Sequence, residues 1–289
     1  MEQLTREQID QLITDIKQKK ELQEISDDFV KQYLLKHFRK EQKVEEQLSK
    51  KFNKKSALYK QIIKSVRADL RRVYGLFRVD EGKKKRQELI KELLKAKNRE
   101  ETIIKILETH SSTKERLTIY AQLYQKILKL TKNPKKIIDL GCGINPFSLH
   151  FIKNKNVTYH AYDISKEEIS VINSYFQILK KENENFKGEA KVLDALQYTK
   201  LKTADVCFLF KMTDVLDRGK GHKTSEEVIS GLPVKYVVVS FATKTMSGKK
   251  MNYPRRGWIE LMCKRLGYKF QLLEYDNELF YIIDKINQS

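Results

Sequence analysis

The sequence contains little cysteine and no long apolar run. Its three cysteines, Cys142, Cys207 and Cys263, lie far apart and form no CxxC pair. This spacing argues against a disulfide framework and against a zinc site, and it is typical of a reducing compartment. No apolar stretch resembles a signal peptide or is long enough to span a membrane. We therefore expect a cytoplasmic protein with no membrane partner and no bound metal.

Acidic residues are scarce relative to basic ones. The 289 residues include 58 Lys and Arg against 38 Asp and Glu, which gives a formal net charge of +20. Such an excess favours a polyanionic partner, because each phosphate that a cation neutralises releases condensed counterions. The alternative is a basic surface that is merely solvated. The charge alone favours a nucleic acid.

Up to about residue 130, proline is absent, glycine occurs only at Gly75 and Gly82, and apolar residues recur at helical spacing. Ser26, which precedes two aspartates, predicts a helix start. The apolar stripe over 58–74 has an opposite face that carries Lys64, Arg67 and Arg71. The cations at 83–86 indicate either a basic loop or a helix start. We predict an all-helical domain over residues 1–105, with these three cations as nucleic-acid contacts, and a second domain over residues 106–289.

Beyond residue 135 the pattern changes to short strands separated by helices. The candidate strands are 136–140, 157–163, 190–194, 204–210, 235–241, 268–275 and 279–284. The first five alternate with helical or loop stretches, which indicates a parallel sheet, whereas the last two are joined by a tight turn and must pair antiparallel. An α/β fold with a seven-stranded, Rossmann-like sheet and one reversed strand resembles the class I methyltransferases that use S-adenosylmethionine (SAM).

The end of the first predicted strand suits a nucleotide-like cofactor. We predict that Asp139 contacts the cofactor. The glycines that follow it, Gly141 and Gly143, permit a sharp turn that brings backbone N–H groups against a ligand. Asn145 stands where a dinucleotide fingerprint has its third glycine, and Pro146 follows it. This departure counts against NAD and favours SAM, which has no pyrophosphate.

Acids also follow the next two predicted strands. Asp163 lies about twenty residues beyond the glycines and suits two ribose hydroxyls as a bidentate acceptor. Asp194 suits the adenine amino group, with Ala195 and Leu196 beside the ring. Acids at strand ends are often ordinary caps, but the occurrence of all three features in register favours a cofactor site.

A further element precedes the first strand. Ser112 and Glu115 have the spacing of a capping box, which predicts one helix from there to about Leu128. Arg116, in its first turn, could reach the glycine loop and pair with the SAM carboxylate through a charge-assisted contact.

The loop after the fifth predicted strand is the candidate substrate contact. Ligands of open α/β sheets bind beyond the carboxyl ends of the strands, and this loop leaves from that edge. Phe210 and Lys211 also lie there, and we predict that Phe210 contacts the cofactor and that Lys211 contacts RNA. It combines Tyr253 with cations that suit phosphates: Lys249, Lys250, Arg255 and Arg256. An aromatic ring with nearby cations is what an unstacked RNA base requires.

Three segments, HSSTKERL at 110–117, DLGCGINPF at 139–147 and VSFATKT at 239–245, resemble the aminoglycoside-resistance 16S rRNA methyltransferases of the ArmA, Rmt and Sgm group. The segment 66–77 is similar to the last N-terminal helices of that family. The family methylates guanine N7 in the decoding-site helix. The resemblance implies that its helical domain docks on the small ribosomal subunit and that the following residues contact SAM: Tyr74, His110, Arg116, Gly141, Asp163 and Asp194.

The resemblance also implies target-base contacts by Ser240, Thr243 and Lys244. Two departures, Ala242 where the family has proline and Lys114 where it has arginine, leave the target nucleotide open. The alternatives are methylation of another rRNA or tRNA nucleotide such as adenine N1, a small-molecule methyltransferase, and a catalytically silent RNA-binding or ribosome-assembly factor. No Asn/Asp-Pro-Pro-Tyr motif follows the fourth strand, which argues against exocyclic amine methylation. We expect a monomer.

Overall fold

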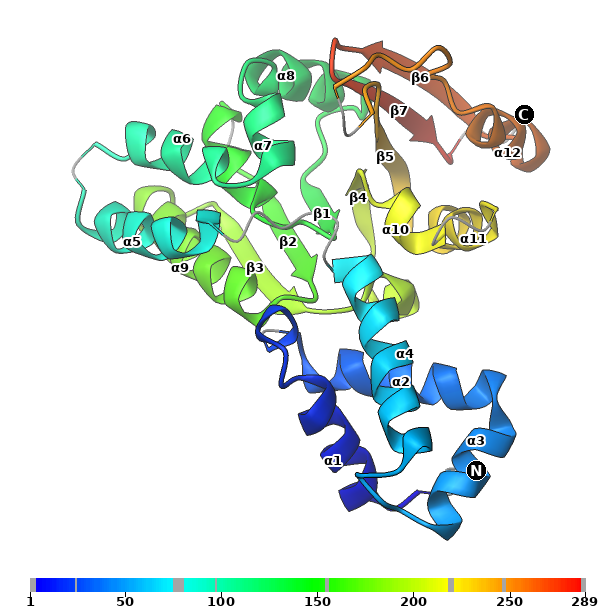
Figure 1. The fold of residues 1–289 in the computed structure, drawn as a ribbon. Coiled ribbons are helices and arrows are strands. Elements are labelled where there is room, and N and C mark those ends of the chain that lie inside the picture. Colours follow the sequence, from blue (N-terminus) through cyan, green and yellow to red (C-terminus); the bar gives the residue numbers. More distant parts are fainter. Residues whose placement is uncertain are drawn as a thin grey trace. The chain divides into compact units, whose positions relative to one another are not determined.

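The computed structural model describes residues 4–23, 25–74, 81–96, 98–153, 156–217, 221–245 and 248–286. The chain forms two compact units (Figure 1). The first comprises residues 1–78 with 164–166, and the second comprises residues 79–163 with 167–289.

The described part of the first unit is helical, as the sequence predicts. It contains α1 (Arg6–Ile16), a short 3₁₀ turn (Lys20–Leu22), α2 (Asp27–Lys40), α3 (Gln42–Lys50) and α4 (Ala57–Tyr74). The hydroxyl of Ser26 accepts the N–H of Phe29 at 3.2 Å, which confirms the predicted start of α2. The apolar stripes meet in one core, where burial of each Leu or Ile contributes about 1.5–3 kcal/mol. This core includes Leu12, Ile16, Val30, Leu34, Ile62 and Leu70.

Four further helices precede the sheet and belong to the second unit: α5 (Glu81–Lys95), α6 (Glu100–Glu108), α7 (Ser111–Arg116) and α8 (Tyr120–Leu130). The predicted boundary at residue 105 is therefore wrong. The reason is packing, since Leu93, Ile106 and Leu107 share a core with sheet residues such as Ile137 and Tyr159. Helix periodicity alone does not reveal which core an apolar stripe joins.

The second unit is built on a seven-stranded sheet of order β3-β2-β1-β4-β5-β7-β6. Its strands are β1 (Lys136–Leu140), β2 (Thr158–Asp163), β3 (Lys187–Val192), β4 (Ala204–Phe210), β5 (Val234–Ala242), β6 (Lys269–Glu274) and β7 (Glu278–Asp284). The first five pair in parallel, whereas β7 pairs antiparallel with both β5 and β6. The predicted reversed strand is thus confirmed.

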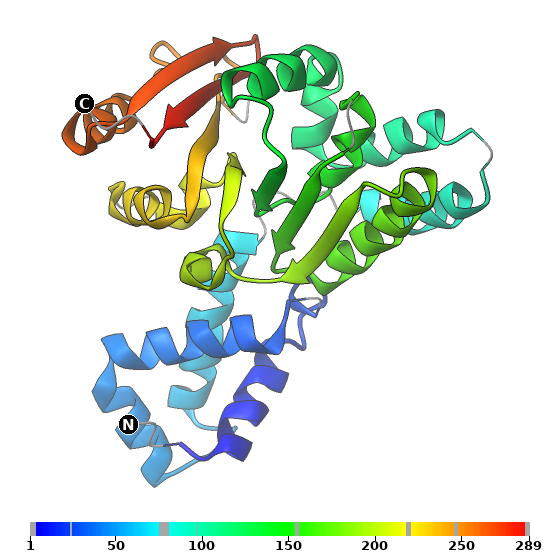
Figure 2. The same cartoon turned by 180° about the vertical axis from the view of Figure 1, so that it is seen from behind.

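Helices cover both faces of this sheet (Figures 1 and 2). One core joins α5, α6, α8 and α9 (Lys166–Glu182) to side chains such as Tyr236 and Val238 of β5. The other joins α10 (Thr213–Asp217), α11 (Lys223–Gly231) and α12 (Gly257–Leu266) to Val237 and Val239. Because β5 is buried on both faces, its sequence is a continuous apolar run rather than an alternation.

Two local predictions need correction. The third strand ends at Val192, so Asp194 lies beyond it as the N-cap of a 3₁₀ helix (Ala195–Lys200). The predicted helix from Ser112 to Leu128 is broken into α7 and α8, and Ser112 is not its cap, since α7 begins one residue earlier after His110. In the described ranges, no helix is long and apolar enough to cross a membrane. The same ranges hold no cluster of three or more His, Cys, Asp or Glu residues suited to a metal ion.

Candidate functional site

The glycine loop lies between the carboxyl ends of β1 and β2. The N–H groups of Gly141 and Cys142 both donate to the Tyr162 carbonyl, at 2.8 and 3.0 Å. The N–H of Gly143 donates to Oδ2 of Asp163 at 2.9 Å. The two glycines have φ of +71° and +49°, a left-handed conformation that disfavours any side chain. The loop therefore turns tightly, as the sequence predicts, and lies against Asp163, whose contact with the ribose stays a prediction.

Asp139 supports this loop from below. Its Oδ2 accepts hydrogen bonds from Asn145 Nδ2 at 2.8 Å and from the Tyr159 hydroxyl at 2.7 Å. Burial raises the pKa of this carboxyl to about 6, against the opposing effect of those two hydrogen bonds. Its other oxygen, Oδ1, is buried and has no hydrogen-bond partner among the residues that the structure describes. Asp139 therefore positions the loop through Oδ2, and its predicted cofactor contact stays a prediction.

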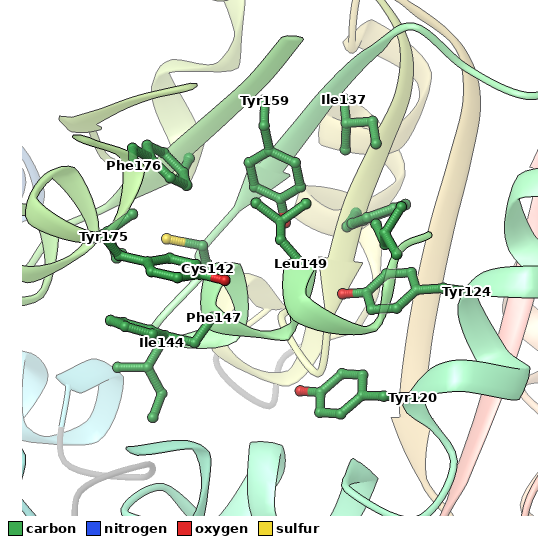
Figure 3. Packing of buried hydrophobic residues seen from close by; sticks show 14 of the residues in the cluster. Tyr120, Tyr124, Ile137, Cys142, Ile144, Phe147, Leu149, Tyr159, Tyr175 and Phe176 are labelled. Carbon is green, nitrogen blue, oxygen red and sulfur yellow. The ribbon is translucent and has the colours of Figure 1, made fainter. Parts of the chain in front are cut away.

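A tightly packed aromatic cluster lies under the same loop (Figure 3). The rings of Phe147 and Tyr175 stack with centroids 4.6 Å apart, and Cys142 lies among them. Phe147 belongs to the 3₁₀ helix Asn145–Phe151, which follows the glycines directly. The segment after the loop is therefore held by core packing, which leaves the loop backbone little freedom to move.

Gly141→Ala tests this cradle. A Cβ on Gly141 would lie 2.1 Å from the Met212 sulfur and would also be strained at positive φ. We expect SAM affinity to fall by about tenfold or more, as measured by calorimetry. Gly248→Ala is the control, because Gly248 has φ of +81° but nothing within 4 Å of the added Cβ. Unchanged affinity in Gly141→Ala, or an equal loss in the control, would contradict the assignment of this loop.

The second predicted acid, Asp194, lies where the chain turns after β3. Its Oδ1 accepts the N–H of Leu196 at 2.9 Å and so caps the following 3₁₀ helix. Ala195 is buried and Leu196 is half-buried in the core beneath. The structure thus places these three residues at the carboxyl edge of the sheet. Their contact with adenine stays a prediction.

His110 approaches the glycine loop from the other side. A Cβ on Gly143 would lie 3.8 Å from Nε2 of His110. Burial lowers the pKa of His110 to about 4, so the imidazole is neutral at physiological pH. Its buried Nδ1 has no hydrogen-bond partner among the residues that the structure describes. The imidazole therefore lies beside the cradle through Nε2, and it carries a second, buried ring nitrogen without a partner that is available to a ligand.

Arg86 fixes the segment that carries His110. Its guanidinium donates to the Thr109 hydroxyl at 2.9 Å, to the Thr109 carbonyl at 3.3 Å and to Glu168 at 3.1 Å. The basic stretch at 83–86 is therefore part of helix α5, and its last residue is buried rather than exposed to RNA.

Arg116 contacts a carboxylate of the protein itself. Its Nε and Nη2 donate to Glu278 at 2.8 and 2.7 Å, and both residues are almost fully buried. The guanidinium also lies 4.8 Å from the Phe210 ring centroid. Arg116 therefore pairs with Glu278 through Nε and Nη2, and its contact with the SAM carboxylate stays a prediction. Phe210 packs against Arg116 at this edge.

Glu278 was not predicted from the sequence. It begins β7 and lies 162 residues from Arg116 along the chain. Lys211 shares this cluster, with its Nζ 2.5 Å from Glu115 and 3.7 Å from Glu278. Lys211 is therefore less available to phosphates than predicted. A single acid at a strand start gives no signal that would distinguish it from a surface residue.

Ser240 is fully buried in β5, and its hydroxyl accepts the N–H of Lys211 at 3.0 Å. It therefore holds Lys211, which has a positive φ of 55°, and the structure does not support direct contact between Ser240 and a base. Thr243 and Lys244 leave the strand end and are partly exposed. Both residues donate to Asp276 in the β6–β7 turn. The Thr243 hydroxyl donates to the main-chain carbonyl of Asp276 at 2.7 Å, and the Lys244 ammonium donates to the Asp276 carboxylate.

The cations of the loop after β5 differ in availability. Arg256 donates to the carbonyls of Pro254 and Ala242 and lies over Phe241, so it shapes the loop. Arg255 forms a bidentate pair with Glu260. Lys249 and Lys250 are exposed, and Lys250 shares Asp276 at 3.2 Å. Of the four predicted RNA contacts, Lys249, Lys250 and Arg255 are therefore the exposed ones, and contact with RNA stays a prediction for all four.

The predicted RNA contacts of the first unit also include both residues that bond within the protein and an exposed lysine. The guanidinium of Arg67 donates to the carbonyls of Asp15 and Ile16 and so caps the end of α1. Arg71 pairs with Glu21, whereas Lys64 is exposed. Lys64 and Arg71 line a cavity of about 300 Å³ whose wall also includes Lys19, Lys54 and Lys60. The side chain of Tyr74 lies outside the described residues.

These features fit SAM. The cradle offers a tight turn without side chains at Gly141 and Gly143, an acid at the end of β2, another just beyond the end of β3, and a neutral imidazole. Asp163 would hold the ribose hydroxyls, and His110 would face the cofactor beside Gly143. When bound, SAM supplies a methyl group on a sulfonium that a nucleophile can displace.

Known proteins share the sequence and the fold. The profile described as ribosomal RNA methyltransferase (FmrO) matches residues 56–282. The 16S rRNA (guanine(1405)-N(7))-methyltransferase of Proteus mirabilis is 28% identical over 251 residues, which cover 78% of this chain and 85% of that protein. Its counterpart from Micromonospora echinospora is 30% identical over 187 residues, 62% of this chain and 64% of that protein. The structure of 16S rRNA methyltransferase RmtF with S-adenosyl-L-homocysteine has a TM-score of 0.71 at 18% identity and covers 97% of this chain and 99% of that chain.

Proposed function

We propose that this chain, which belongs to the ribosomal RNA methyltransferase (FmrO) family, transfers a methyl group from SAM to N7 of a guanine in 16S rRNA. Membership of the family confirms the resemblance drawn from the sequence motifs. The observation that carries the proposal is the continuity of one sheet edge. The glycine cradle, Asp163 and His110 lie at the carboxyl ends of β1 and β2, and the loop with Lys249 and Lys250 leaves the carboxyl end of β5.

Guanine N7 suits this site because it carries an in-plane lone pair and no proton. Its methylation needs no general base, so the residues of the site have only to orient the base and accommodate charge. Thr243 and Lys244, anchored to the β6–β7 turn, would position the base. Lys211 and Arg116 lie deeper and balance the acids Glu115 and Glu278.

The first unit would dock on the small ribosomal subunit. Its cavity of about 300 Å³ is lined by several lysines and by Arg71, which favour a phosphate backbone rather than a base edge. We propose that Lys64 and its neighbours hold the substrate and contribute nothing to SAM binding. The enzyme would act as a monomer in the cytoplasm. By modifying the decoding-site helix it would give resistance to aminoglycosides.

The experiment that tests this function supplies labelled SAM with naked 16S rRNA, assembled small subunits and tRNA, and maps the product. We expect one N7-methylguanine in the decoding-site helix of the small subunit. Methylation of tRNA, or of adenine N1, would replace the proposal by that activity. No transfer to any of the three, with SAM binding intact, would favour a silent RNA-binding factor. Drug susceptibility of a strain that expresses the chain tests the resistance.

Replacing Lys249 and Lys250 together with alanine should weaken small-subunit binding and flatten its salt dependence. The log–log slope should fall by up to about 0.9 for each lost phosphate contact. The matched control is Arg256→Lys, because Arg256 is bonded to carbonyls and should contribute little to the slope. Binding measured at several salt concentrations decides the matter. An unchanged slope in the double variant would identify these lysines as ordinary surface.

A further inference from the structure

An aromatic stack lies beside the proposed substrate loop. The imidazole of His222 is stacked on Trp258, with ring centroids 4.5 Å apart and planes 9° from parallel. Trp258 meets Phe241 edge to face at 6.2 Å, and the Arg256 guanidinium covers Phe241 at 5.0 Å. The series His222, Trp258 and Phe241 therefore runs from the surface into the core, and the partly buried Arg256 lies over Phe241. Phe241 directly follows Ser240 in β5.

The outer member of this stack is held in place but left open. Nδ1 of His222 lies 3.4 Å from Oδ2 of Asp217, whose side chain is 5% exposed, while the His222 side chain is 49% exposed. Asp217 is itself fixed by the N–H and hydroxyl of Ser225, at 2.9 and 2.7 Å. One face of the imidazole is covered by the indole, and about half of the side chain stays exposed. A ring that is oriented by a buried acid and backed by an indole is preorganised for stacking.

We propose that His222, backed by Trp258, is a stacking platform for an unpaired base of the substrate RNA that neighbours the target nucleotide. This inference rests on the proposed function. His222 directly precedes α11 and Trp258 is the second residue of α12, and these helices follow β4 and β5. The platform therefore belongs to the connections that leave the substrate edge. Exposed cations of the same two connections complement the phosphates of such a strand: Lys223, next to His222 in the chain, and Lys249 and Lys250, in the loop before α12.

The chemistry of the ring selects this occupant. Imidazole and indole faces stack on any base, and RNA enzymes use such rings for bases that are splayed out of the helix. Nε2 of His222 can also hydrogen-bond a base edge or a 2′-hydroxyl. Asp217 does not repel RNA strongly, because its buried carboxylate is already bonded to Ser225 and His222.

Four proteins test the platform: wild type, His222→Ala, His222→Leu and His222→Phe. We expect the Ala and Leu variants to bind small subunits about tenfold more weakly, as expected for one lost base stack, and the Phe variant to bind like wild type. SAM affinity should be the same in all four. Leu tests bulk without a π face, and Phe tests stacking without a hydrogen bond. Equal binding by all four, or rescue by Leu as well as Phe, would overturn the inference.

A second measurement asks whether RNA reaches the stack directly. Trp258 is the only tryptophan in the chain, so indole emission reports this site alone. Naked 16S rRNA contains no tryptophan, and it should quench Trp258 emission saturably. Unchanged emission at RNA concentrations that saturate binding in a filter assay would refute the platform. If wild type instead fails to bind or methylate any rRNA, the proposed function itself fails, and the two failures are distinguishable.

Discussion

Replacing Glu278 with glutamine is expected to lower the free energy of unfolding by about 3–5 kcal/mol. The variant leaves the Arg116 guanidinium charged inside the protein without its carboxylate partner. Arg116 and Glu278 have 2% and 1% of their side chains exposed, so water cannot replace the lost contact. Urea denaturation of the full chain measures the change. The loss should be larger than that of almost any surface substitution.

The double variant Arg116→Met, Glu278→Met distinguishes the effect of the ion pair on stability from its effect on activity. Removing both charges removes the unpaired ion, so the double variant should be more stable than Glu278→Gln. Its activity should nevertheless stay low, because Glu278 also lies next to the turn that anchors Thr243 and Lys244 and 3.7 Å from Lys211. A stable double variant with wild-type turnover would show that the pair serves stability alone. Glu278→Gln without loss of stability would mean that the pair forms no net interaction.

The Arg116–Glu278 pair could not be predicted from the sequence, whereas the strands and the glycine loop could. The strands were predictable because each carries a short apolar run between helices, and β1 and β4 were predicted at their observed bounds. Gly141, Gly143 and Asp163 were predictable because a tight turn after a parallel strand restricts which residues can occur. These are local requirements, and they are visible in a few adjacent positions.

Long-range partners were not predictable in this way. Arg116 was predicted to pair with the SAM carboxylate because its helix precedes the glycine loop. In the structure the carboxylate that it pairs with belongs to Glu278, the first residue of β7. Arg67 and Arg256 were predicted as RNA contacts from their charge, but in the structure their guanidinium groups donate hydrogen bonds to backbone carbonyls. A carbonyl acceptor has no side chain and so leaves no trace in a sequence. The same limit placed the domain boundary at residue 105, because two amphipathic helices look alike whichever core they join.

Asp163→Ala is expected to weaken SAM binding by more than about tenfold. The carboxylate would hold both ribose hydroxyls, and its Oδ2 also accepts the Gly143 N–H at 2.9 Å, so its removal loosens the cradle as well as the cofactor. Calorimetry on the full chain measures the affinity, which should be micromolar or tighter in wild type. Retained affinity in the variant would remove Asp163 from the site, and the proposed cradle with it.

Asp205→Ala supplies the matched control for this prediction. Asp205 also accepts backbone N–H groups with its carboxylate, from Lys135 at 2.9 Å and Lys136 at 3.0 Å, but it does so at the amino end of β1. It also pairs with Lys235, which lowers the pKa of Asp205 against the opposing effect of burial. Its loss should cost stability without changing SAM affinity. If both variants bind SAM equally weakly, the effect of Asp163 is general loosening of the sheet. A loss confined to Asp163→Ala assigns the ribose contact to the carboxyl edge, where the substrate loop also begins.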